Sequence, residues 1–138
     1  MIESSLVTYY GNFITASIGA TSEVEFDFEK IWNFKKSIGA DFNIDALHWY
    51  HVHPENMLWY SQTDLNCVKG FNLAFGDLKS FSIITFDGGD LNDLSHKQIT
   101  FDYNKQDPNE LALAENFPLQ DKNIYLLKAL SYGYVTVP

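Results

Sequence analysis

Two histidines separated by one residue, His51 and His53, are the residues whose types and spacing most clearly suggest chemistry. They belong to the stretch WYHVHPENMLWYSQTDLN, residues 49–66, which also contains Ser61 and Asp64. Successive side chains of a β-strand point to opposite faces, so a strand here places both imidazoles on the same side. Two imidazoles on one face are well placed to share a metal ion.

An aspartate offers a third ligand to such a metal. Ser61 suits the N-cap of a helix, and Asp64 would then lie in the first helical turn, where the helix dipole favours an ionised carboxylate. Two histidines and one aspartate leave a fourth position for water, which is the pattern of a catalytic zinc site. Each part also has a plain alternative, because most histidines bind no metal and Ser-x-x-Asp is an ordinary capping box. Only the combination favours a metal site.

The segment HVHPENMLWYSQTD resembles the JAMM motif of the JAB/MPN metalloproteases, H-x-H-P-x6-S-x-x-D, with every fixed position filled. The preceding ALHWYHVHP is similar to the family's usual lead-in, and the order of expected elements is similar up to about Asn104. The resemblance is to small prokaryotic or phage-type members, and it implies the JAB/MPN (cytidine-deaminase-like) fold. It also implies that His51, His53 and Asp64 bind zinc and that Ser61 helps to hold the oxyanion of a tetrahedral intermediate.

The family also uses an upstream glutamate that takes a proton from water and passes it to the leaving amine. This glutamate normally opens the first strand of a hairpin. Glu3 opens ESSLVTYYG, eight residues before Gly11, so we expect it to be the general base. Glu23 and Glu25 lie in the next expected strand, and Glu29 begins an expected helix. The plain alternative for Glu3 is a carboxylate near the N-terminus with no role.

Strands and helices that alternate along the chain must position these residues. The periodicity and turn signals predict strands at 4–11 and 12–18, joined at Gly11-Asn12, and at 22–28, 45–53, 80–87, 97–104 and 134–137. They predict helices at 29–39, 61–76, 108–117 and 121–133. We therefore expect an α/β (α+β) protein in which a single mixed sheet is flanked by helices, as one domain over residues 1–138.

Composition narrows the functional classes. The chain has 138 residues and a net charge of −9, which argues against binding to nucleic acid or to anionic membranes. Its single cysteine, Cys67, excludes an intrachain disulfide and a four-cysteine zinc site. No apolar run approaches the roughly 18 residues of a membrane span, and the first residues do not resemble a signal peptide. We expect a cytoplasmic protein.

The function that follows is a zinc-dependent metallopeptidase or isopeptidase that hydrolyses an amide with a metal-activated water. The resemblance implies a substrate that is a peptide or a ubiquitin-like protein. The alternative is a catalytically silent MPN-like interaction module, which follows if no glutamate reaches the water. A cupin-type metal enzyme also uses H-x-H, but it requires a later glutamate in an all-β barrel. The substrate's identity and the oligomeric state stay open.

Four other residues have interpretations unrelated to metal. His48 faces away from the histidine pair and is expected to be a surface or sheet histidine. Cys67 lies beside the apolar stripe of its helix and is expected to be packed. Trp59 and Tyr60 either line a substrate groove or fix the motif loop to the core.

Overall fold

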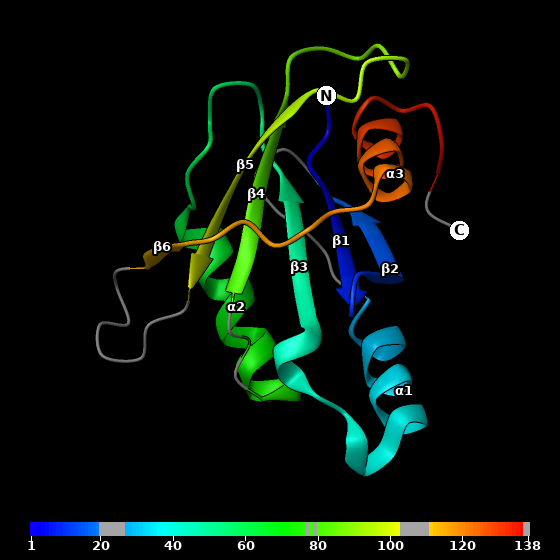
Figure 1. The fold of residues 1–138 in the computed structure, drawn as a ribbon, viewed down its shortest axis with the longest axis vertical. Coiled ribbons are helices and arrows are strands. Elements are labelled where there is room, and N and C mark those ends of the chain that lie inside the picture. Colours follow the sequence, from blue (N-terminus) through cyan, green and yellow to red (C-terminus); the bar gives the residue numbers. More distant parts are fainter. Residues whose placement is uncertain (20–26, 77, 79, 103–110, 137–138) are drawn as a thin grey trace.

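Six strands form one sheet in the computed structural model, which describes residues 1–19, 27–76, 78, 80–102 and 111–136 (Figure 1). The strands are β1 (Ser4–Tyr9), β2 (Asn12–Ile18), β3 (Leu47–Val52), β4 (Ser80–Phe86), β5 (His96–Asp102) and β6 (Ala112–Ala114). The helices are α1 (Phe28–Ile38), α2 (Gln62–Phe75) and α3 (Asp121–Ser131), with 3-10 turns η1 (Gly39–Asp41) and η2 (Ile44–Ala46).

The strand order is β2-β1-β3-β4-β5-β6. β3 and β4 are parallel, whereas the other neighbouring pairs in the described sheet are antiparallel. Parallel neighbours need a crossover connection, and α2 provides it between β3 and β4. The expected single mixed sheet with flanking helices, an α+β fold, is therefore confirmed.

The β1–β2 hairpin turns one residue earlier than the sequence suggested. Tyr9 pairs with Asn12, so the two-residue loop is Tyr10-Gly11 and Asn12 already belongs to β2. Both loop residues have positive φ, 50° and 79°, as a type I′ turn requires. Asn12 was expected to share the turn, but Gly11 takes the second left-handed position, where the lack of a Cβ removes the steric penalty.

Helices cover both faces of the sheet, and each face has its own core. One core lies on the side of α1 and α2 and includes Ile31, Trp49, Phe71 and Phe81. The other lies on the side of α3 and includes Leu6, Tyr50, Phe86, Ile124 and Leu127. In Figure 1, α2 (green) lies behind the central strands, and the orange segment that leads to α3 crosses in front of them.

The expected helices at 29–39, 61–76 and 121–133 are confirmed as α1, α2 and α3. The helix expected at 108–117 is wrong for its described part, because Ala112–Ala114 form the edge strand β6, which pairs with β5. The helix-favouring alanine, leucine and glutamate residues give only a weak local preference, which pairing to a sheet edge overrides.

Two expected strands are not found among the described residues. Residues 134–136 form no strand, which contradicts the short final strand expected at 134–137. The strand expected at 22–28 falls mostly on residues outside the described ranges, and Phe28 begins α1. Among the described helices, none is both long enough and apolar enough to cross a membrane.

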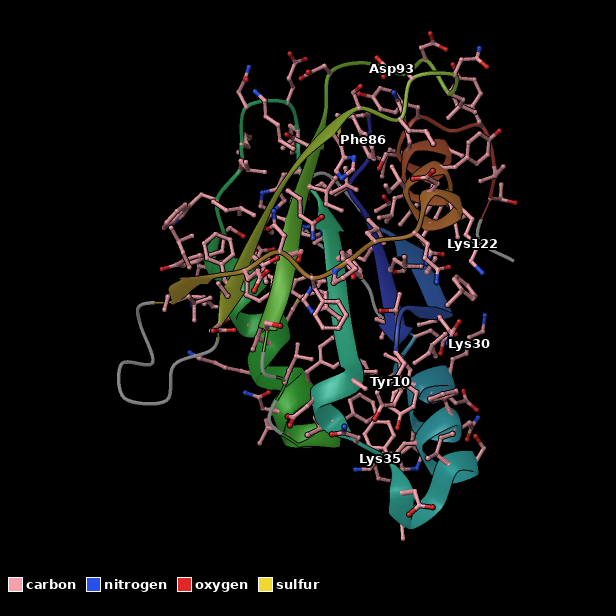
Figure 2. The ribbon with its side chains drawn as sticks, in the orientation of Figure 1. Tyr10, Lys30, Lys35, Phe86, Asp93 and Lys122 are labelled. Carbon is pink, nitrogen blue, oxygen red and sulfur yellow. The ribbon has the colours of Figure 1, made fainter. Side chains whose placement is uncertain are left out.

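The elements that carry the motif residues meet at one end of the molecule. In Figure 2, Phe86 at the end of β4 lies toward one end of the molecule, and Tyr10, which follows β1, lies toward the other. β3 is parallel to β4 and antiparallel to β1. The carboxyl ends of β3 and β4 therefore meet the beginning of β1 at the same end.

Candidate metal centre

His51 and His53 lie at the carboxyl end of β3, on the same side of the strand. Their ring centroids are 4.6 Å apart, and the rings are nearly perpendicular. His51 pairs with Ser5 of β1, and the His53 backbone N–H donates to the Ile84 carbonyl of β4. Both residues are buried, with exposed fractions of 1% and 4%. The expected shared orientation of the two imidazoles is confirmed.

The Nδ1 atom of each imidazole faces a backbone carbonyl. His51 Nδ1 lies 3.2 Å from the Ser4 carbonyl oxygen, and His53 Nδ1 lies 2.9 Å from the Met57 carbonyl oxygen. A carbonyl only accepts, so these contacts favour a ring proton on Nδ1 in both histidines. A metal-binding histidine needs this Nδ1 proton, because its Nε2 must then offer a lone pair to the metal, whereas in the metal-free protein the Nε2 of His53 carries a proton toward the Asp64 carboxylate when His53 is charged.

Asp64 approaches both Nε2 atoms at the start of α2. Its Oδ1 lies 3.4 Å from His51 Nε2, and its Oδ2 lies 3.2 Å from His53 Nε2. The carboxylate is held by Ser61, whose backbone N–H donates to Oδ2 at 2.7 Å. Asp64 is 1% exposed, so little water competes for these contacts.

Glu3, which directly precedes β1, faces the same pair of nitrogens. Its Oε1 lies 3.7 Å from His51 Nε2 and 3.8 Å from His53 Nε2, and the residue is 8% exposed. Hydrogen bonds on both sides hold the backbone, from Ile2 N–H to the Ser131 carbonyl and from Gly19 N–H to the Glu3 carbonyl. Glu3 is therefore a fixed, buried part of the cluster and not a carboxylate without contacts.

A buried group that could hold a metal ion consists of Glu3, His51 and His53, whose ligand atoms lie within 4.8 Å of one another. Asp64 adds a second carboxylate. In a tetrahedral zinc site with bonds of about 2.0–2.1 Å, ligand atoms are about 3.3–3.4 Å apart. Each Asp64 oxygen lies near that spacing from a different imidazole, whereas the one Glu3 oxygen lies farther from both Nε2 atoms. The spacing favours Asp64 as the carboxylate ligand and Glu3 as its neighbour.

The charges of the cluster differ from those of the same groups in water. Burial raises the pKa of the Glu3 carboxyl, which the positive charge of His53 offsets only in part. Burial lowers the pKa of His51 to about 4, so its imidazole is neutral at pH 7. Burial is also the largest influence on His53 and Asp64 and opposes their charges. Their mutual hydrogen bond, the neighbouring opposite charges and a backbone hydrogen bond to each together outweigh burial, so the pKa of His53 is raised and that of Asp64 is lowered.

Ser61 forms the N-cap of α2. Its Oγ accepts from the Asp64 N–H at 3.2 Å, while its own N–H donates to the Asp64 carboxylate, which completes a capping box. The capping role that the sequence suggested as the plain alternative is therefore present. Accepting one hydrogen bond leaves the hydroxyl proton of Ser61 available to a further acceptor, and the residue is exposed.

The other motif residues have structural positions. His48 is fully buried on the opposite face, where its Nε2 lies 2.8 Å from Ser82 Oγ, so the surface alternative is wrong and the sheet alternative is right. Cys67 packs against the core, as expected. Trp59 and Tyr60 both contact the Phe101 ring edge-on, which fixes the motif loop to the sheet, although Trp59 stays 52% exposed.

The sequence did not indicate two contributors to the site, the Ser5 hydroxyl and the Met57 carbonyl. Ser5 Oγ lies 3.1 Å from His51 Nδ1. Strand alternation from Glu3 was the one available signal for Ser5, because residues two apart share a face. The carbonyl of a loop residue such as Met57 carries no signal in its side chain.

Comparison with models of known protein families gives no match, and no curated protein matches the chain. The chemistry of the site is therefore inferred from the positions of its own residues.

Proposed function

We propose that this protein is a zinc-dependent hydrolase of the JAMM type, which cleaves an amide bond in a peptide or at the tail of a ubiquitin-like protein. One observation carries the proposal. Two buried imidazoles, each held through Nδ1 by a carbonyl, direct Nε2 toward Asp64 at the spacing of zinc ligands, and a second buried carboxylate stands slightly farther away.

The residues present fit zinc. His51, His53 and Asp64 would hold it through two nitrogens and one oxygen, the donor types that zinc accepts. Three protein ligands leave a position open, which distinguishes a catalytic from a structural zinc site. When bound, zinc lowers the pKa of a coordinated water to about 7 and polarises a substrate carbonyl.

Glu3 has the properties of the proton carrier in this proposal. Its buried carboxylate has a raised pKa, which brings its proton affinity closer to the neutral range where a general base works best. Its Oε1 faces both imidazole Nε2 atoms, so the oxygen lies beside the space where the metal ligands converge. It would accept a proton from the attacking water at that oxygen and then donate it to the leaving amine.

Ser61 has a complementary role. An amide carbonyl under attack develops negative charge on its oxygen, and a positioned hydroxyl stabilises that charge by donating a hydrogen bond. The cap geometry fixes Ser61 Oγ beside Asp64 and uses the oxygen only as an acceptor. Its proton is the group that would donate to the substrate oxygen.

The test is amide cleavage by the zinc-loaded protein on a panel of fluorogenic peptides and ubiquitin-like fusions. Glu3→Gln is expected to keep the fold and the bound zinc and to lose roughly 10²–10⁴-fold in rate, because it removes the proton acceptor but not a ligand. Glu55→Gln is the matched control, since Glu55 is an exposed glutamate in the loop after β3.

Two results would contradict parts of this proposal. If Glu3→Gln cleaves as fast as the wild type, another residue is the base, and Glu23 and Glu25, which lie outside the described residues, are the next to change. If the zinc-loaded wild type cleaves no member of the panel, the interaction-module alternative is favoured, and binding partners replace substrates as the object of the search.

A further inference from the structure

We propose that Ser5 is a positioning residue for His51, and that the indole of Trp49 holds its hydroxyl in place. This inference rests on the zinc site proposed above and concerns how one of its ligands is oriented. Ser5 lies on β1 directly opposite His51 of β3 and is 1% exposed.

Three groups meet around the Ser5 hydroxyl. Trp49 Nε1 donates to Ser5 Oγ at 3.0 Å, and His51 Nδ1 lies 3.1 Å from the same oxygen. The Trp49 ring also stacks on the His51 ring, with centroids 5.2 Å apart and planes 21° from parallel. The indole therefore contacts His51 directly through its face and indirectly through Ser5.

The donor inventory assigns the direction of these bonds. An indole N–H only donates, so it always occupies one of the two lone pairs of Ser5 Oγ. The second lone pair can accept from His51 Nδ1–H. The Ser4 carbonyl, which also faces Nδ1 at 3.2 Å, cannot donate, so it favours the same protonated Nδ1. Ser5 and Ser4 together hold the tautomer that leaves Nε2 free for a metal.

Ser5 adds a constraint that the Ser4 carbonyl alone does not supply. Two acceptors flanking Nδ1 define the plane of the imidazole, and the stacked Trp49 ring opposes its rotation. Groups that hydrogen-bond to the far nitrogen of a metal-bound histidine typically change metal affinity by about 10–100-fold when they are removed. We expect the loss of the Ser5 hydroxyl to have an effect of this size.

The neighbouring serine supplies a matched control. Ser4 is also fully buried, but its hydroxyl faces the other side of the sheet, bonding the Leu127 carbonyl and Ser131 Oγ of α3. Ser4→Ala removes a buried hydroxyl one residue away while keeping the backbone carbonyl that contacts His51. A general weakening of β1 would affect both variants, whereas loss of His51 positioning affects only Ser5→Ala.

The experiment measures zinc affinity by competition with a chromophoric chelator, together with the imidazole ¹⁵N shifts of His51 in the metal-free protein. Ser5→Ala is expected to bind zinc about 10–100-fold more weakly and to gain some of the Nε2–H tautomer. Ser4→Ala is expected to keep wild-type affinity and the Nδ1–H tautomer. Ser5→Thr, which restores a hydroxyl with a residue that suits a strand, is expected to recover the affinity.

The alternative outcomes separate this inference from the proposed function. If the wild type binds zinc and Ser5→Ala binds it equally well, the positioning role is wrong and the zinc site stands. Equal losses in Ser4→Ala and Ser5→Ala also overturn the role. If the wild type binds no zinc, the proposed function is wrong, and the His51 tautomer in Ser5→Ala then tests the positioning role. If Ser5→Ala does not fold, the wild-type tautomer still tests the inference, because Nε2–H on His51 would overturn it.

Discussion

Bound zinc should raise the Tm of the protein by an amount that follows from the zinc concentration relative to its Kd and from the chain length. The ligands come from β3, from the residue that directly follows it and from the start of α2. An unfolded chain holds no such preformed site, so the free energy of zinc binding adds to the free energy of folding. At free zinc about 100 times its Kd, the added stability is about 2.7 kcal/mol. Unfolding entropy of about 2.1 cal/mol/K per residue gives about 0.29 kcal/mol/K for 138 residues. The expected rise in Tm is therefore about 9 °C.

Two isosteric variants test which carboxylate binds the metal. Asp64→Asn keeps an oxygen that accepts from Ser61 N–H, so it preserves the helix cap while removing the charged ligand. Glu3→Gln makes the same chemical change at the carboxylate that stands 3.7 and 3.8 Å from the imidazole nitrogens. We expect Asp64→Asn to lose most of the zinc-induced rise in Tm and Glu3→Gln to retain it.

Thermal unfolding followed by circular dichroism, with and without zinc, is the assay. Magnesium serves as the control ion, because it prefers oxygen ligands in octahedral geometry and should leave Tm unchanged. The reverse pattern, in which Glu3→Gln loses the shift and Asp64→Asn keeps it, would show that Glu3 is the ligand. The distance argument would then be refuted. Absence of any zinc shift in the wild type would refute the metal site itself.

Two further predictions concern Ser61 and His48. Ser61→Gly removes the hydroxyl but keeps most of the N-cap stability, so Tm should be nearly unchanged. In a peptide assay its rate of amide cleavage should fall by roughly 10²–10³-fold. An unchanged rate would assign Ser61 to capping alone. Burial lowers the pKa of His48 from 6.5 to about 3, so between these pH values only the unfolded chain binds the proton and acid favours unfolding. At about 1.36 kcal/mol per pH unit, up to about 5 kcal/mol of stability is lost across that window. The free energy of unfolding of His48→Gln, measured with urea, should therefore depend less steeply on pH than that of the wild type. Equal pH dependence in the two proteins would contradict this prediction.

Local signals predicted the elements that carry the site. Ser61 and Gly76 are the N-cap and C-cap of α2, as the sequence predicted. Caps can be predicted because they depend on a few adjacent residues. The alternation of β3 placed His51 and His53 on one side and His48 on the other, because side-chain direction in a strand depends only on residue parity. The position of Glu3 beside the histidines also agrees with the sequence-based choice.

Features that depend on distant partners were not predictable in this way. His48 is buried because Ser80 and Ser82 of β4 satisfy both ring nitrogens and because Phe117 stacks on the ring. None of these partners is close to His48 in the sequence. The strand at Ala112–Ala114 similarly depends on the free edge of β5. Such long-range contacts override weak local preferences, so the local pattern carries no record of them.

The two interpretations of Ser-x-x-Asp, a capping box and part of a metal site, are compatible because one carboxylate serves both. Asp64 Oδ2 accepts the Ser61 N–H at 2.7 Å and lies 3.2 Å from His53 Nε2. Because the Asp64 side chain folds back onto the N-cap, its carboxylate is fixed at the start of α2. The positive end of the helix dipole there also favours the ionised form of the carboxylate. An unconstrained aspartate would lose side-chain entropy on binding a metal, whereas this one is already ordered by the cap. The spacing between Ser61 and Asp64 thus has a folding explanation, and only the two imidazoles beside it turn a common helix start into a candidate metal site.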